Sequence, residues 1–159
     1  MKTSTISQLK KELQHYSNNE LLELCLRLAK FKKENKELLS YLLFESHDES
    51  GYIENIKRDL DVQLEAINTK NYYWMRKSIR KILKNLKKHI RYSLKKETEV
   101  ELLLYFCVQL KTMSPSIKND KTLLNLFLRQ VNYIQKRIET LHEDLKYDFQ
   151  KQMERHDLL

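Results

Sequence analysis

Apolar residues recur along this chain at the three- and four-residue spacings of amphipathic helices, with little of the alternation that is typical of strands. The clearest case is the set Ile53, Ile56, Leu60, Leu64 and Ile67, which forms one narrow stripe. The pattern predicts seven helices joined by short connections. Their approximate ranges are 6–16, 17–33, 36–45, 52–67, 72–94, 98–113 and 121–156.

Polar residues mark several of the expected helix boundaries. Ser17 and Glu20 have the spacing of a capping box, and a second box begins at Thr98, so each is expected to begin a helix. Asp120 is placed to cap the last helix. The only glycine, Gly51, lies in a polar run that is predicted to be a loop.

Three of the predicted helices carry apolar side chains around most of their circumference, which is typical of helices packed on several sides. They contain the ranges 21–31, 38–44 and 100–110, and we expect them in the centre of the fold. Short connections favour antiparallel hairpins of the remaining helices around this centre. The sequence therefore predicts a single all-α domain over residues 1–159, either a helical bundle or a short α-solenoid, with a long C-terminal helix at about 121–156.

The composition excludes several classes of function. The chain has one Gly and one Pro, whereas a P-loop, a dinucleotide fingerprint and an EF-hand loop all need glycine at set positions. The longest uncharged apolar run is far shorter than the roughly 20 residues of a membrane span, so none is expected. Cys25 and Cys107 lie far apart inside apolar runs and are expected to be buried free thiols of a cytoplasmic protein.

The sequence contains no arrangement typical of an enzyme or a metal centre. His47, Asp48 and Glu49 are adjacent, but neighbouring residues rarely point at one ion, and no zinc-ligand spacing occurs. We therefore expect no catalytic residue, no metal and no small-molecule cofactor. The expected activity is binding rather than catalysis.

Positive charge is concentrated on the helix predicted at 72–94, in a chain whose net charge is +8. Residues 68–96 contain eleven Lys or Arg and no Asp or Glu. On a helical projection nine of these cations share an arc of about 140°, opposite the apolar stripe of the same helix. The nine residues are Arg76, Lys77, Arg80, Lys81, Lys84, Lys87, Lys88, Arg91 and Lys95.

Three aromatic residues, Tyr73, Trp74 and Tyr92, lie within or beside this arc. Evenly spaced cations can neutralise successive phosphates, and exposed rings can stack on unpaired bases. We therefore interpret the arc as a binding surface for an anionic partner, either a nucleic acid or an acidic protein. The alternative is that the arc is merely solvated, or is covered by acidic residues such as Glu20 and Glu49 from the first third of the chain.

The last predicted helix carries a heptad pattern of apolar residues. Its seam contains Phe127, Val131, Ile134, Ile138, Leu141 and Leu145. A helix of 36 residues would extend about 54 Å, far beyond the radius of gyration of about 15 Å expected for the domain, unless it lies across the whole bundle. The alternative function is therefore a protein–protein interaction or homodimerisation module acting through this helix, with the basic arc only solvated.

Two features resemble known groups of proteins. The Leu-rich run 20–45, interrupted by Lys-Phe-Lys-Lys-Glu-Asn-Lys, resembles small all-helical bacterial proteins of unknown function. The stretches 24–43 and 106–128 each pair a cysteine-centred apolar helix with a Leu-rich helix, an internal similarity that resembles the hairpin repeats of HEAT and armadillo proteins. These resemblances imply a cytoplasmic bacterial protein and a solenoid arrangement of hairpins, and they supply no site residue.

Overall fold

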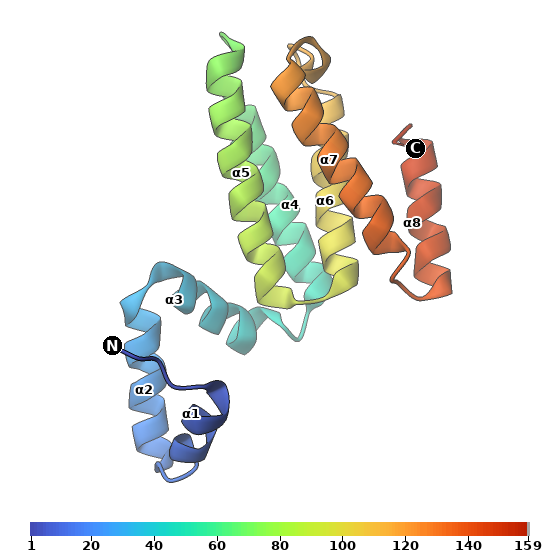
Figure 1. Cartoon of the computed structure of the whole chain (residues 1–159). Coiled ribbons are helices and arrows are strands. Elements are labelled where there is room, and N and C mark those ends of the chain that lie inside the picture. Colours follow the sequence, from blue (N-terminus) through green and yellow to red (C-terminus); the bar gives the residue numbers. More distant parts are fainter. Residues whose placement is uncertain (159) are drawn as a thin grey trace. The chain divides into compact units, whose positions relative to one another are not determined.

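The computed structural model describes residues 1–158, which form eight α-helices and no strand (Figure 1). The all-α prediction is therefore confirmed. In place of the single domain expected over 1–159, the chain divides into two compact units. We call them the N-terminal unit (Met1–Phe44) and the C-terminal unit (Glu45–Leu159).

The N-terminal unit consists of three short helices. They are α1 (Ile6–Leu13), α2 (Asn18–Phe31) and α3 (Lys33–Ser40), and a π-helical turn, η1 (Tyr41–Glu45), follows α3. The capping box predicted at Ser17 is present, because Ser17 and Glu20 satisfy each other's backbone N–H groups. Asn35 Nδ2 donates to the Leu28 carbonyl over 2.8 Å and satisfies the carboxyl end of α2 at the turn into α3.

None of the helices α1, α2 and α3 contains a buried residue. Leu28 and Phe31 expose 62% and 76% of their surface, and Cys25 is exposed rather than buried. The prediction that α2 and α3 lie in the centre of the fold is therefore wrong. An apolar circumference indicates burial only where enough chain is present to surround the helix, and a 44-residue unit is too small to do so.

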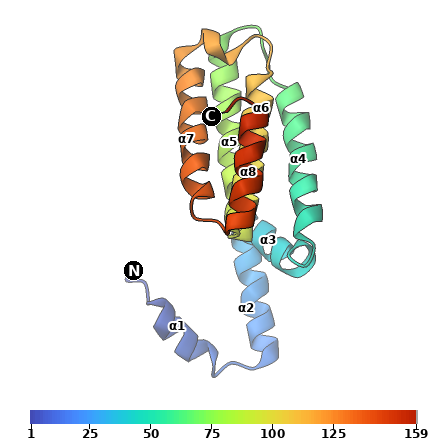
Figure 2. The same ribbon diagram turned by 90° about the vertical axis from the view of Figure 1, so that its right-hand side faces the viewer.

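The C-terminal unit is a bundle of five helices. Its elements are α4 (Glu49–Glu65), α5 (Tyr72–Ser93), α6 (Lys96–Lys111), a 3-10 turn η2 (Ile117–Asn119), α7 (Lys121–Ile138) and α8 (Glu143–Arg155). Helix α6 packs against α4, α5, α7 and α8, and the two views show it between them (Figures 1 and 2). The consecutive residues Leu102, Leu103 and Leu104 are all buried, so α6 is enclosed on several sides, as its apolar circumference predicts.

The predicted long helix at 121–156 is instead two helices. The chain reverses after Ile138, and His142 accepts a hydrogen bond from the Asp144 N–H as the N-cap of α8. The reversal returns α8 towards α6 and buries Phe149 and Met153. The burial of the apolar face of α8 stabilises the fold and compensates for the backbone hydrogen bonds lost where the helix breaks. The heptad spacing alone does not reveal this stabilisation.

The predicted heptad seam lies mainly in the chain's own core. Val131, Ile134 and Ile138 expose 6%, 0% and 1% of their surface. Leu141 lies in the turn after α7, and Leu145 belongs to α8. The other three residues of the seam, Phe127, Leu141 and Leu145, are half-buried. The six residues therefore leave no continuous exposed apolar seam for a second chain, which counts against dimerisation through this helix.

Two helix boundaries also differ from the prediction. Gly51 lies in the first turn of α4, where its N–H donates to the capping carboxylate of Asp48. A Cβ at residue 51 would lie 2.3 Å from Asp48 Oδ2, so a larger residue there would displace the capping carboxylate. Thr98 does not cap α6, which already begins at Lys96; it is buried and donates to Glu49 over 2.6 Å.

The central position of α6 predicts a steep dependence of stability on its largest buried side chain. Phe106 is fully buried, so Phe106→Ala should lower the free energy of unfolding by about 3–5 kcal/mol, measured by urea denaturation. Leu128→Ala is the matched control, because Leu128 is 46% exposed and its truncation should cost less than about 1 kcal/mol. Equal losses from the two substitutions would contradict the placement of α6.

Candidate anion-binding surface

Helix α5 has one buried face and one exposed face. Asn71 caps its first turn by accepting from the Trp74 N–H over 3.1 Å. The inner face is formed by Met75, Ile79, Ile82 and Ile90, each less than 7% exposed. Because these residues fix the rotation of α5 about its axis, the opposite side of the helix points to solvent.

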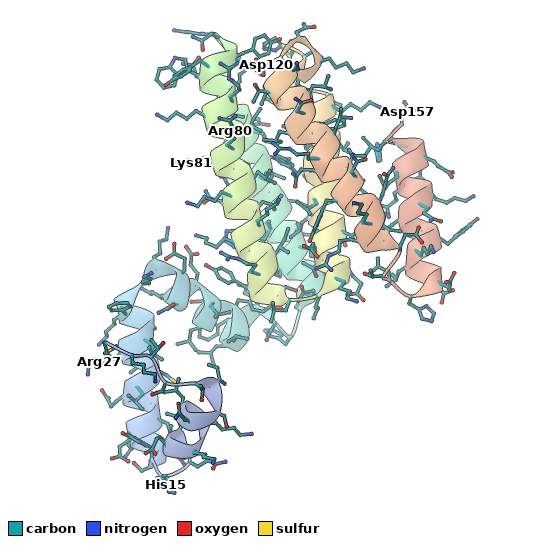
Figure 3. The ribbon with its side chains drawn as sticks, in the orientation of Figure 1. His15, Arg27, Arg80, Lys81, Asp120 and Asp157 are labelled. Carbon is teal, nitrogen blue, oxygen red and sulfur yellow. The ribbon has the colours of Figure 1, made fainter. Side chains whose placement is uncertain are left out.

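Six cations of the predicted arc are exposed on this outer side, and one of them, Lys87, also places its Nζ over the Tyr133 ring of α7, 5.8 Å from the centroid. Helical spacing brings each within one turn of the next along α5. Within residues 1–158, no carboxylate forms an ion pair with any of the six. We call them the basic ladder: Lys77, Arg80, Lys81, Lys84, Lys87 and Arg91. Figure 3 labels Arg80 and Lys81, with Lys81 on the side of α5 turned away from α6 and α7.

The residues at the two ends of the predicted arc have structural partners instead. Arg76 Nη1 lies 2.6 Å from Asp120 Oδ2, and Asp120 also caps α7 by accepting from the Leu123 N–H over 2.9 Å. Burial raises the pKa of Asp120, but the hydrogen bonds from Leu123 and Arg76 outweigh it, so the net shift of the pKa is downward. This interaction ties the second turn of α5 to the start of α7.

Lys95 lies outside the helix that carries the ladder. Leu94 ends α5 in the left-handed conformation, with φ of 58°, so Lys95 leaves the projected arc. Its Nζ lies 3.0 Å from Glu49 Oε2, and this is the pairing with an acidic residue of the first third that the alternative interpretation expects. Lys88 is half-buried and is not counted in the ladder.

Other acidic residues of the C-terminal unit are engaged away from the ladder. Lys57 bridges Glu54 and Glu101, with Nζ–O distances of 2.9 and 2.7 Å. Glu99 accepts from Arg137 and Tyr133, both over 2.7 Å. Asp61 accepts from the Tyr105 hydroxyl, and burial together with this carboxylate raises the pKa of Tyr105 to about 12. Pairing of these carboxylates on α4 and α6 leaves the positive charge of the ladder without a counter-charge.

The three predicted stacking residues differ in exposure. Tyr73 and Trp74 expose 60% and 43% of their surface, and their rings meet edge to face with centroids 5.2 Å apart. Tyr92 is only 8% exposed, and its ring packs edge to face on His89, so it offers no face to a ligand. The prediction for Tyr92 is therefore wrong. It lies at the edge of the arc, where a side chain can turn towards either face of the helix.

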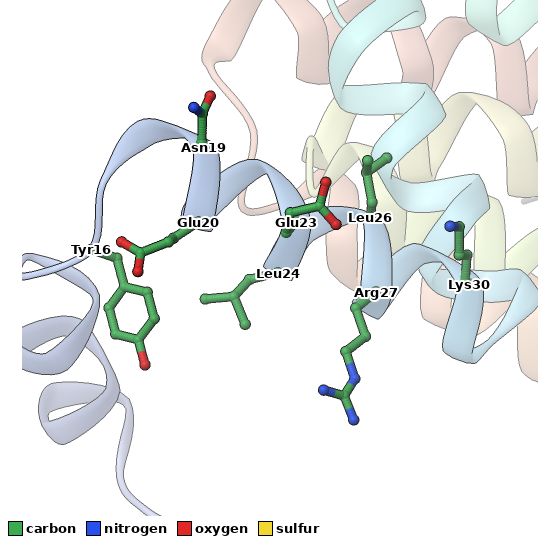
Figure 4. Close-up of a pocket in the computed structure, with 8 residues that line it drawn as sticks. All are labelled: Tyr16, Asn19, Glu20, Glu23, Leu24, Leu26, Arg27 and Lys30. Carbon is green, nitrogen blue, oxygen red and sulfur yellow. The ribbon is translucent and has the colours of Figure 1, made fainter.

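The N-terminal unit also has a hollow on its surface. It is an open surface depression of about 600 Å³, and Figure 4 shows it along α2 with Tyr16 at one end. Glu20 is already used in the capping box. The lining residues are Tyr16, Asn19, Glu20, Glu23, Leu24, Leu26, Arg27 and Lys30. Across the part of the chain that the structure describes, no three His, Cys, Asp or Glu residues are grouped to hold a metal ion.

Comparisons of the chain with protein-family models, curated proteins and solved structures found no match. The resemblances to small bacterial helical proteins and to HEAT or armadillo hairpins therefore stay predictions. None of the helices over residues 1–158 is both long enough and apolar enough to span a membrane.

The Arg76–Asp120 interaction predicts a pH-dependent contribution to stability. Asp120→Ala removes both the cap of α7 and the partner of Arg76, and should lower the free energy of unfolding by about 1–2 kcal/mol at neutral pH. The pKa of Asp120 is lowered in the folded state, so this contribution is present above the unfolded pKa of about 3.9 and is lost as the pH falls through the folded value. Urea titrations of wild type and variant should therefore converge in acid. A difference in stability that stays constant down to low pH would show that ionised Asp120 is not its source.

Proposed function

We propose that this protein is a non-enzymatic binding protein whose basic ladder on α5 contacts an anionic partner. The observation that supports the proposal is the set of six exposed cations without an acidic partner among the described residues. The buried inner face of α5 holds the ladder on a rigid element, so the six cations lie along one side of the helix before a partner binds.

The spacing of the ladder favours an extended polyanion over a compact anion. From Lys77 to Arg91 the helix rises about 21 Å, and successive turns place a cation every 4.5–6 Å or so. The cations do not converge on one point, as a site for a single small anion requires. A polymer with regularly repeated negative charge can contact several of them at once.

Like charges on adjacent turns of a helix repel each other by about 0.2–0.5 kcal/mol per pair. The ladder contains several such pairs, including Lys77 with Lys81 and Lys87 with Arg91. A bound polyanion would remove this repulsion and also release its own condensed counterions. Both effects favour binding at low ionic strength.

A second candidate function is homodimerisation through the N-terminal unit. Six of its large apolar side chains expose between 56% and 81% of their surface, more than single scattered apolar residues on a monomer require. They include Ile6, Leu22, Leu28, Phe31, Leu43 and Phe44. At roughly 150–200 Å² for a large side chain, these six expose on the order of 700 Å² in total, spread over α1, α2 and η1, and a stable interface takes about 800 Å² from each partner.

The small size of the N-terminal unit supports a second copy of the chain as the occupant. Units of about 40 residues usually need a disulfide, a metal or oligomerisation to be stable. Cys25 is a free thiol, and the described residues hold no metal-binding group. An open apolar hollow of about 290 Å³ between α2 and α3, lined in part by Leu28, Leu38 and Leu42, is available to receive side chains of the partner.

The proposed function predicts a strong salt dependence of binding to heparin, a probe polyanion, measured by fluorescence anisotropy. If four to six cations engage a single-stranded chain, log Kd should change with log salt with a slope of magnitude roughly 3 to 4. The quadruple substitution Arg80→Gln, Lys81→Gln, Lys84→Gln and Arg91→Gln should flatten this slope and weaken binding at low salt. Its circular dichroism should be unchanged, because all four side chains are exposed.

A matched variant separates the ladder from net charge. The substitutions Arg58→Gln, Lys136→Gln, Lys151→Gln and Arg155→Gln remove the same charge from exposed positions on α4, α7 and α8. This control should retain most of the salt slope. If both quadruple variants weaken heparin binding equally, binding depends on net charge alone and the ladder is not the site. If the wild-type protein does not bind heparin at low salt, the proposal is refuted.

The second candidate predicts a mass of twice 19.4 kDa by light scattering. Leu28→Glu with Phe31→Glu should give a monomer with unchanged helix content, because the charges would be placed in the interface. The control Leu128→Glu with Tyr147→Glu, at exposed positions of the C-terminal unit, should stay dimeric. A monomeric wild type, or a dimer that survives the first pair of substitutions, rules out this interface.

A further inference from the structure

We propose that the anionic partner of the basic ladder is a single-stranded nucleic acid, with an unpaired base stacked on Trp74. This inference rests on the proposed function of the ladder and assigns its class of ligand. It depends on a second feature of α5, the aromatic pair Tyr73 and Trp74, which an acidic protein or a sulfated polysaccharide does not need.

The aromatic pair lies one turn before the first cation of the ladder. Trp74 and Lys77 are three residues apart, about 4.5 Å along the helix axis. The Lys77 Nζ lies over the Trp74 ring, 5.4 Å from its centroid, so the first cation adjoins one face of the ring and a base would stack on the opposite face. A nucleotide bound there could place its phosphate on Lys77 and its base on Trp74.

The exposure of the pair has no explanation in the folding of the bundle. Trp side chains are usually well buried, yet Trp74 exposes 43% of its surface and Tyr73 exposes 60%. The edge-to-face contact between the two rings restrains Trp74 while leaving it accessible. An exposed, restrained ring beside a row of cations is the combination by which proteins bind single strands without sequence preference.

The same features discriminate between possible polyanions. An unpaired base offers a π-face for stacking, whereas the bases of a duplex are covered by their neighbours. Heparin offers negative charge but no base. Lys is the more frequent cation of the ladder, with four Lys and two Arg, which suits contact with the phosphate backbone more than recognition of base edges.

Trp74 is the only tryptophan of the chain, so its intrinsic fluorescence reports on this position alone. Adding a short oligouridine at low salt should quench the fluorescence as the base stacks on the ring. Heparin should bind the ladder, as judged by competition with the labelled oligonucleotide, without comparable quenching. A duplex of the same length should bind more weakly than the single strand and quench less.

Substitution of the ring gives the second part of the test. Trp74→Ala should weaken oligouridine binding by about 5- to 100-fold and leave heparin binding unchanged, while Trp74→Phe should retain most of the affinity. Tyr147→Ala is the matched control, since Tyr147 is an exposed aromatic on α8 that is 58% accessible. The exposed position of Trp74 makes loss of folding in either variant unexpected, and circular dichroism checks it.

Each outcome bears on one of the two proposals. Heparin binding that depends on the ladder, without quenching by oligouridine, would overturn the stacking inference and leave the ladder as an anion-binding surface. Unchanged oligouridine affinity in Trp74→Ala, or tighter binding of the duplex, would also overturn it. If no polyanion binds the wild-type protein, the proposed function of the ladder as an anion-binding surface is refuted.

Discussion

The burial of α6 on several sides determines the arrangement of the C-terminal unit. Val100, Leu102, Phe106 and Cys107 have no exposed surface, so α4, α5, α7 and α8 must each supply apolar contacts around them. Burial raises the pKa of Cys107 to about 12 and holds its thiol neutral, as expected in an apolar interior. Each surrounding helix is therefore fixed in rotation by the face that it turns towards α6.

For α5 this rotation has an electrostatic consequence. Once Met75, Ile79 and Ile90 are buried, the positions between them in the helical repeat must face solvent, and these positions carry the basic ladder. Some acidic residues on the neighbouring helices are paired with other cations, as Glu54 and Glu101 are with Lys57. The core thus orients a row of cations outward, and among the described residues none of these six cations forms an ion pair with a carboxylate.

Local patterns in the sequence predicted those parts of the structure that depend on one helix. The arc on α5 and the caps at Ser17 and Asp120 follow from helical spacing and from single side chains. An apolar circumference predicted the enclosed position of α6 correctly but was wrong for α2 and α3, which contain no buried residue. Features that depend on packing between elements could not be predicted in this way. The reversal after Ile138 depends on what Phe149 and Met153 reach once α8 turns back, and the heptad spacing is the same whether or not the helix breaks.

The candidate site, too, was predicted correctly where it depends on one helix and incorrectly where it depends on contacts between helices. The projection identified all six cations of the ladder, because exposure opposite an apolar stripe is a property of one helix. It also included Arg76 and Lys95, whose partners Asp120 and Glu49 come from distant segments, and Tyr92, which the fold buries. The exposed apolar surface of the N-terminal unit was likewise not foreseen, since an apolar sequence does not show how much chain is available to cover it.

The most direct test of the account is to map the contact surface residue by residue. Backbone amide chemical shifts of the full chain should be followed by NMR during titration with a short oligouridine at low salt. The account predicts that the largest shifts fall on residues 73–91 of α5 and on the indole N–H of Trp74, with small changes on the outer faces of α7 and α8. Shifts confined to the N-terminal unit or to α7 and α8, with α5 unaffected, would contradict it.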